Sequence, residues 1–291
     1  MYCGIIGNVL FPVWFFQGIQ KMRYITILNM SGRICTMLGI FLLVKSPDDY
    51  ILAAFLQACT PLIAGIFSIV WLRKHYTGLF KWPTIGEIIN SYKEGWSIFV
   101  SSLAVNLYTA TNIVVLGMLT NNVIVGYYSA ADKLITCVRR GIYAVSDAIY
   151  PFISKMMKDD ISKGLQFIKK QIFLYLVVGL ISCTSLFFFS DTIVKLLFGA
   201  DYNLTVDVLR ILSFVPLAVA ISTVFGEETM LPLNMNSAYS RTLVLAAFFS
   251  LLSIFPLCYL WGAKGVAMTM LLTEFLIMII MGGLLRKQLF Q

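Results

Sequence analysis

Residues 127–151, YYSAADKLITCVRRGIYAVSDAIYP, decide the fold of this chain. On a helix that turns about 100° per residue, apolar side chains at steps of three and four share one face: Ala131, Ile135, Val138, Ile142, Val145 and Ile149. The opposite face is polar and charged: Asp132, Lys133, Thr136, Arg139, Arg140, Tyr143 and Asp147. The rest of the chain decides whether this charged face meets water, lipid headgroups or the inside of a helical bundle.

The composition is that of an integral membrane protein. Hydrophobic residues make up 59% of the 291 residues and charged residues 12%, whereas about a quarter of a soluble domain is charged. The mean hydropathy is +0.85. In a membrane protein, excess Lys and Arg mark cytoplasmic loops. The net charge of +8 therefore does not indicate a nucleic-acid partner, and we expect none.

No pattern in the chain is typical of a catalytic or metal site. The 6 cysteines are scattered without a Cys-x-x-Cys pair, and the 1 histidine, His75, lies in a basic loop. The nucleophile-elbow, phosphate-loop and zinc-protease motifs are absent. We therefore expect no catalytic residue, no metal ligand and no cofactor.

Apolar runs long enough to cross a bilayer recur along the chain. Since a span needs about 20 residues, we predict an all-α polytopic membrane helix bundle with about eight full transmembrane helices plus a partial N-terminal one, residues 1–16. The predicted spans are residues 25–44, 51–72, 96–118, 127–151, 171–190, 208–225, 242–260 and 265–285. Residues 155–170 are predicted to be a basic loop, and Glu227 and Glu228 to open a polar connection.

The distribution of basic residues orients these spans. One side of the membrane receives most of the loop lysines and arginines, within residues 21–23, 73–93, 155–170, 241 and 286–287. The other side receives Lys45, Lys195 and Lys264. The positive-inside rule places the first side in the cytoplasm. The two most basic loops flank spans 96–118 and 127–151, so both are cytoplasmic only if the charged helix crosses the membrane.

A charged helix that crosses the membrane cannot turn its charges toward lipid, because each such residue near mid-span costs roughly 2.5–3.5 kcal/mol. Two interpretations remain open. In the first, Asp132 or Asp147 pairs with basic residues of neighbouring helices and holds the bundle together. In the second, the helix lines a water-filled cationic cavity for an anionic substrate. An excess of cations favours the cavity, although Arg33 and Arg210 could instead reach the membrane interface.

Three groups of motifs carry a family resemblance. They are PVWFFQGIQKM at 12–22, GYYSAADKL at 126–134 with IYPF at 149–152, and LLFGADY at 196–202 with LRIL at 209–212. In this order and spacing, the chain resembles the Wzx-type flippases of O-antigen and capsular polysaccharide. These belong to the multidrug/oligosaccharidyl-lipid/polysaccharide exporter superfamily.

The resemblance implies twelve spans in two six-helix lobes around a central cavity. It also implies transport of undecaprenyl-diphosphate-linked oligosaccharide repeat units across the bacterial inner (cytoplasmic) membrane for O-antigen or capsule biosynthesis. On this pattern the chain is N-terminally truncated. Residues 1–83 would be a remnant of the N-terminal lobe with a cytoplasmic linker, and residues 84–291 a complete C-terminal six-helix lobe. The implied partners are the lipid-linked oligosaccharide, membrane lipid and the polysaccharide polymerase machinery.

Under this interpretation the ionisable residues of the spans have two expected roles. The expected substrate path holds the cations Arg33, Lys133, Arg139, Arg140 and Arg210. The carboxylates Asp132, Asp147 and Glu274 are expected to set the charge balance or to sense ions.

Three alternatives remain open. They are an exporter of another small molecule in the same superfamily, a membrane enzyme of polysaccharide assembly, and a non-functional truncated remnant. An enzyme would be expected to have a large extracytoplasmic loop or a catalytic His or Asp constellation, and the sequence shows neither.

Overall fold

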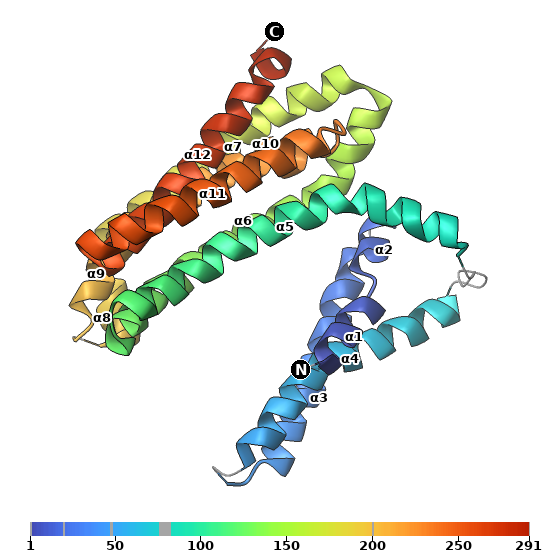
Figure 1. Ribbon diagram of the computed structural model, residues 1–291. Coiled ribbons are helices and arrows are strands. Elements are labelled where there is room, and N and C mark those ends of the chain that lie inside the picture. The colour runs from blue at the N-terminus through green and yellow to red at the C-terminus, as the bar shows by residue number, and fades with distance from the viewer. Residues whose placement is uncertain (1, 20, 47–48, 76–82, 200, 291) are drawn as a thin grey trace. The chain divides into compact units, whose positions relative to one another are not determined.

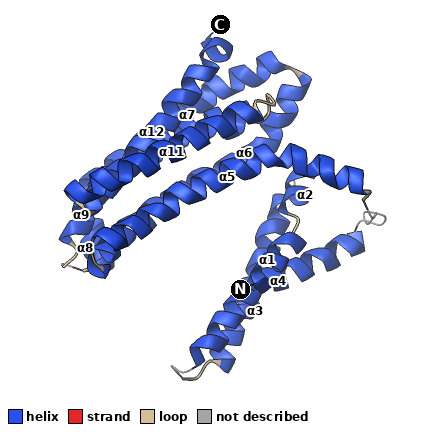
Figure 2. Ribbon diagram, in the orientation of Figure 1, coloured by secondary structure: helices blue, strands red, loops and turns tan. Residues whose placement is uncertain are grey.

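The computed structural model describes residues 2–19, 21–46, 49–75, 83–199 and 201–290. All regular structure within these residues is helical (Figure 2). The chain divides into two compact units, Met1–Thr84 and Ile85–Gln291, called unit 1 and unit 2 below. Residues 76–82, part of the predicted cytoplasmic linker, lie outside the described residues.

The α-helices that the structure describes in unit 1 are α1 (Tyr2–Leu10), α2 (Val13–Gly18), α3 (Met22–Leu43) and α4 (Tyr50–His75). Two glycines, Gly7 of α1 and Gly65 of α4, let these helices pack directly against each other. A Cβ atom added to Gly65 would lie 2.8 Å from the carbonyl oxygen of Gly7 and 2.9 Å from Cβ of Leu10. Helices in a membrane pack through such small residues, since lipid supplies no hydrophobic force between them. Between α3 and α4, Thr60 donates a hydrogen bond of 2.9 Å to the Thr36 hydroxyl.

Unit 2 is a bundle in which long helices lie side by side with shorter ones (Figure 1). Its elements are α5 (Ile85–Leu119), α6 (Asn122–Asp159), α7 (Ile161–Phe188), α8 (Ser190–Phe198), α9 (Asn203–Leu212), α10 (Val215–Phe225), the π-helical turn η2 (Gly226–Met230), α11 (Asn236–Trp261) and α12 (Ala263–Phe290).

The predicted membrane bundle is confirmed. Within the described residues, 7 helical segments are long and apolar enough to cross a membrane: Arg23–Leu43, Ile51–His75, Ile85–Leu119, Ile161–Phe188, Asn203–Met230, Asn236–Trp261 and Ala263–Arg286. They correspond to the predicted spans other than the charged one. The charged helix, α6, has 38 residues, about 57 Å at the usual rise per residue. It packs against α7, α9 and α10 and so belongs to the bundle.

The face of α6 that packs into unit 2 differs from the predicted apolar face. Ala131, Ile135 and Ile142 are buried as expected, but Val145 is 48% exposed and Ser146 only 1% exposed. Lipid can cover an apolar side chain, whereas a polar group in the membrane needs a partner in the protein. The most apolar side of a membrane helix is therefore not necessarily its buried side.

The basic segment 155–170 is not a loop, as the sequence predicted, but the end of α6 and the start of α7. Asp160 separates the two helices and caps α7. Its carboxylate accepts hydrogen bonds from the hydroxyl and backbone N–H of Ser162, at 2.7 and 2.9 Å, and from the N–H of Lys163 at 3.3 Å. These bonds hold the pKa of Asp160 below its usual range. A capping carboxylate of this kind satisfies N–H groups that the first helical turn leaves free.

The predicted span 208–225 is built from separate pieces. Helix α9 ends at Leu212, and α10 begins with Val215 and Pro216, whose ring cannot donate a backbone hydrogen bond. The predicted polar connection at Glu227 and Glu228 is wrong, because η2 continues α10. In η2 the N–H of Leu231 donates to the Gly226 carbonyl at 3.1 Å.

We predict that Gly65→Ala will destabilise unit 1, because the new methyl group collides with the α1 backbone. Such overpacking costs about 1–3 kcal/mol, and thermal unfolding in detergent should show a lower Tm. Gly39→Ala is the matched control, since its Cβ would meet only Leu56 side-chain atoms at 3.6 Å. Equal Tm values for the two variants would contradict the close packing of α1 on α4.

Candidate functional site

A buried ion pair joins α6 to α12. Nη2 of Arg139 lies 3.2 Å from Oε1 of Glu274, and the two side chains are 11% and 4% exposed. The Tyr108 hydroxyl of α5 donates to the same carboxylate oxygen at 3.1 Å. Arg139 also donates to the Tyr143 hydroxyl at 3.4 Å. We call these four residues the polar cluster, and they come from three different helices.

The polar cluster lies between two apolar cores of unit 2. On α6, Ile135 belongs to one core and Ile142 to the other. On α12, Met270 and Ile277 flank Glu274 in the same way. Since apolar residues lie on both sides of the ion pair along both helices, it lies within the apolar part of the bundle. Each charge there needs the other, because a buried ion left alone costs about 3–5 kcal/mol.

A second set of charges on α6 lies outside the core of unit 2. Lys133, Arg140 and Asp147 are seven residues apart and all exposed. They extend over about 21 Å of the helix. None of the three forms an ion pair with any residue that the structure describes. We call them the charged stripe. An exposed charge at membrane depth requires water or another protein surface, so this side of α6 is unsuited to lipid.

The remaining predicted site residues have different surroundings. Arg33 is exposed on α3 of unit 1. Arg210 is exposed on α9, and its Nε donates to the Ser190 hydroxyl of α8 at 3.1 Å. Asp132 is half-buried on α6 and is attracted electrostatically by Arg139. The structure therefore brings Arg139 and Glu274 together and ties Arg210 to α8.

Glu228 in η2 is a buried carboxylate that the sequence did not predict. Its Oε1 accepts a hydrogen bond of 2.9 Å from the Tyr175 hydroxyl of α7. The other oxygen, Oε2, is buried and has no hydrogen-bond partner among the described residues. Two glutamates after an apolar run are typical of a loop. No residue pattern marks the π-helical turn that carries Glu228 into the core.

The arrangement can recognise an anionic group electrostatically. Within the described part of the chain, no three His, Cys, Asp or Glu residues are placed to hold a metal ion. The charged stripe provides two cations that no carboxylate of the described residues neutralises. The polar cluster links α6, the helix that carries the charged stripe, to α5 and α12.

Comparison with known proteins identifies the family. Residues 1–157 match the family model described as polysaccharide biosynthesis protein. The chain belongs to this polysaccharide biosynthesis family. The resemblance to Wzx-type flippases is thereby confirmed, and the chain is a multi-pass membrane protein.

Other members of the family are similar over most of the chain. A protein of Shigella dysenteriae named "Putative O-antigen transporter" is 31% identical over 277 residues, which cover 95% of this chain and 69% of the relative. The relative of the same name from Escherichia coli K12 is 30% identical, with 94% and 66% covered. The capsular polysaccharide biosynthesis protein CapF of Staphylococcus aureus is 26% identical, with 89% and 67% covered. The chain therefore spans about two thirds of the length of these relatives.

A solved structure shares the fold. The lipid II flippase MurJ, in an inward closed conformation, matches with a TM-score of 0.70 at 13% sequence identity. The match covers 98% of this chain and 60% of MurJ. At this identity the likeness concerns the helical architecture alone.

We predict that Arg139→Gln and Glu274→Gln will each lower stability by about 3–5 kcal/mol, because each leaves the partner charge buried alone. The double variant should lose clearly less stability than the sum of the two single losses, since neither charge then remains. Thermal unfolding of the purified chain in detergent measures both effects. Arg286→Gln, which removes an exposed arginine near the end of α12, serves as the control. Additive losses would show that the pair does not act as a unit.

For Glu228 we predict a contrast between two substitutions. Glu228→Gln keeps an oxygen that accepts the Tyr175 hydroxyl, so it should leave the Tm within a few degrees of the parent. Glu228→Ala leaves that hydroxyl without its acceptor in the core, which costs about 1–3 kcal/mol. The same melting experiment checks this, with the half-buried Glu227→Ala as a comparison. A glutamine variant as unstable as the alanine variant would contradict a hydrogen-bonding role.

Proposed function

We propose that this protein takes part in moving undecaprenyl-diphosphate-linked oligosaccharide units across the bacterial inner membrane. Three findings support the proposal. The chain belongs to a polysaccharide biosynthesis family, relatives carry the name O-antigen transporter, and the fold is like that of a lipid II flippase.

The observation that carries the proposal is the charged stripe of α6. Lys133 and Arg140 are exposed without a carboxylate partner among the described residues, while the neighbouring Arg139 is neutralised by Glu274. A helix built only for structural pairing would not need cations on a second face. An anionic substrate would supply the missing negative charge.

In the proposed mechanism, cationic side chains of the transport path replace part of the water around the substrate. A diphosphate is strongly hydrated, and moving it through hydrocarbon alone is prohibitively costly. Lys133 and Arg140 would attract the diphosphate in an aqueous path, while the polyprenyl tail stays in lipid. Charge interactions are stronger in such a path than in bulk water. Access would alternate between the two sides of the membrane, as in other transporters with two lobes.

The other predicted residues have supporting roles in this proposal. Arg139 and Glu274 act as positioning residues, because their ion pair fixes how α6 is rotated. Asp132 and Asp147 would limit the excess of positive charge along α6. Arg33 is exposed on α3 of unit 1, and its place in the substrate path stays a prediction from the sequence. Arg210 donates a hydrogen bond to Ser190 of α8. We therefore assign it to the membrane interface rather than to the charged stripe.

The relatives favour transport over the alternative of a membrane enzyme, since two of them are named O-antigen transporters. An exporter of another small molecule would share the fold but not the requirement for a sugar repeat unit. Interaction with the polysaccharide polymerase machinery is part of the proposal and rests on the family resemblance.

Charge reversal at the stripe tests the proposal. We predict that Arg140→Glu, introduced at the native locus, will lower surface polysaccharide at least about tenfold, because attraction of the diphosphate becomes repulsion and each tenfold corresponds to about 1.4 kcal/mol. Gel analysis of surface polysaccharide and an immunoblot of the membrane fraction give the two measurements. Arg140→Lys, which keeps the charge, should retain a substantial part of the export.

Lys169→Glu is the matched control, since it reverses an exposed cation of α7 outside the stripe. Unchanged export in the Arg140→Glu strain would remove Arg140 from the substrate path. Lost export together with a lost membrane level would indicate a folding defect, and Lys133→Glu would then be measured in the same way. Export that does not depend on the host's sugar repeat unit would favour the small-molecule exporter.

A further inference from the structure

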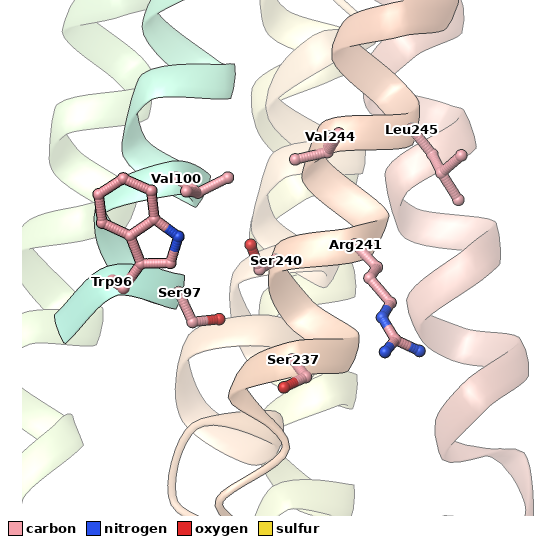
Figure 3. A pocket seen from close by; sticks show the side chains of 8 residues that line it. All are labelled: Trp96, Ser97, Val100, Ser237, Ser240, Arg241, Val244 and Leu245. Carbon is pink, nitrogen blue, oxygen red and sulfur yellow. The ribbon is translucent and has the colours of Figure 1, made fainter. Parts of the chain in front are cut away.

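A pocket of about 550 Å³ lies between α5 and α11 in unit 2 (Figure 3). It is lined by Trp96, Ser97 and Val100 of α5 and by Ser237, Ser240, Arg241, Val244 and Leu245 of α11. None of these residues belongs to the polar cluster or the charged stripe. The pocket is therefore separate from the site described above.

One end of the pocket carries polar groups that lack partners. Arg241 is exposed and forms no ion pair with the described residues. Ser240 is only 8% exposed, and no described residue makes a hydrogen bond with its hydroxyl. Figure 3 shows this hydroxyl on the side of α11 that faces α5. Ser97, by contrast, is already engaged, since it donates to the Asn236 carbonyl at 2.9 Å.

The other end of the pocket is apolar. Val100 lies one turn beyond Trp96 on α5, and Val244 one turn beyond Ser240 on α11. Both valines lie further along the spans predicted from the sequence, residues 96–118 and 242–260. Trp96 is 62% exposed, as is typical of tryptophan at the membrane–water interface. The lining thus changes from charged to apolar in the direction of the membrane interior.

We propose that this pocket binds one anionic phospholipid of the surrounding bilayer. The headgroup phosphate would accept hydrogen bonds from Arg241 at the rim of the pocket, and one acyl chain would lie along Val100 and Val244. A single guanidinium matches the single charge of a phosphodiester. A polyprenyl diphosphate carries more negative charge than this pocket neutralises, which argues for a bilayer lipid over the transported substrate.

The position of Arg241 along the chain agrees with an anionic phospholipid as the occupant. Arg241 lies on the side of the membrane that carries the basic loops, predicted to be cytoplasmic. The cytoplasmic leaflet presents anionic headgroups, which attract basic residues near its surface. The proposal does not depend on the flippase function, because it concerns a lipid that stays bound to the bundle.

Fluorescence quenching by brominated lipid tests this site directly. In a variant of the full chain that keeps Trp96 and replaces the other tryptophans by Phe, brominated phosphatidylglycerol should quench at about fivefold lower mole fraction than brominated phosphatidylcholine, as expected for one basic residue. Arg241→Gln should abolish this preference. Arg286→Gln, an exposed arginine on the same predicted side, should keep it.

Native mass spectrometry of the chain with all its tryptophans gives a second measurement. Retained phosphatidylglycerol should fall in Arg241→Gln and stay unchanged in Arg286→Gln. Equal quenching by the two lipids, or an unchanged preference in Arg241→Gln, would overturn the proposal. So would displacement of the brominated lipid by undecaprenyl diphosphate at lower concentration than by unlabelled phosphatidylglycerol, because the pocket would then belong to the substrate.

Discussion

An arginine buried in the apolar part of a membrane bundle requires a negative partner, and much of unit 2 follows from this. Arg139 meets Glu274 at 3.2 Å, with Tyr108 satisfying the same carboxylate oxygen. Lone charges at this depth are strongly unfavourable, so the pair fixes both the distance between α6 and α12 and the rotation of α6. Apolar cores lie on either side of the pair along both helices.

The orientation of α6 in the bundle places its polar side chains in two different surroundings. Its inner face carries Arg139 and Ser146, which are covered by neighbouring helices. Its outer face carries Lys133, Arg140 and Asp147, exposed on unit 2. The two interpretations of the charged helix are therefore not exclusive. Structural pairing holds the helix in place, and the proposed cationic path uses the side that pairing leaves available.

The irregular backbone of unit 2 lies close to polar groups that are buried in its core. The break between α9 and α10 and the π-helical turn η2 both lie within one membrane passage, Asn203–Met230. Non-helical or distorted backbone at membrane depth is tolerated where protein surrounds it. Here η2 delivers Glu228 to Tyr175 of α7. π-Helical turns inside longer helices are frequent at functional sites.

The sequence alone determined the membrane class, the helical fold, the approximate spans and the family, because these depend on local composition, on the length of apolar runs and on the order of motifs. It also placed Arg139, Glu274 and the charged stripe within spans. It could not pair Arg139 with Glu274, since residues far apart in the chain meet only through helix packing. It did not show that Val145 is exposed and Ser146 buried, because lipid covers apolar side chains as readily as a protein core does. Only the tertiary structure decided which charges of α6 are neutralised and that Glu228 is buried, because both depend on which helices surround each side chain.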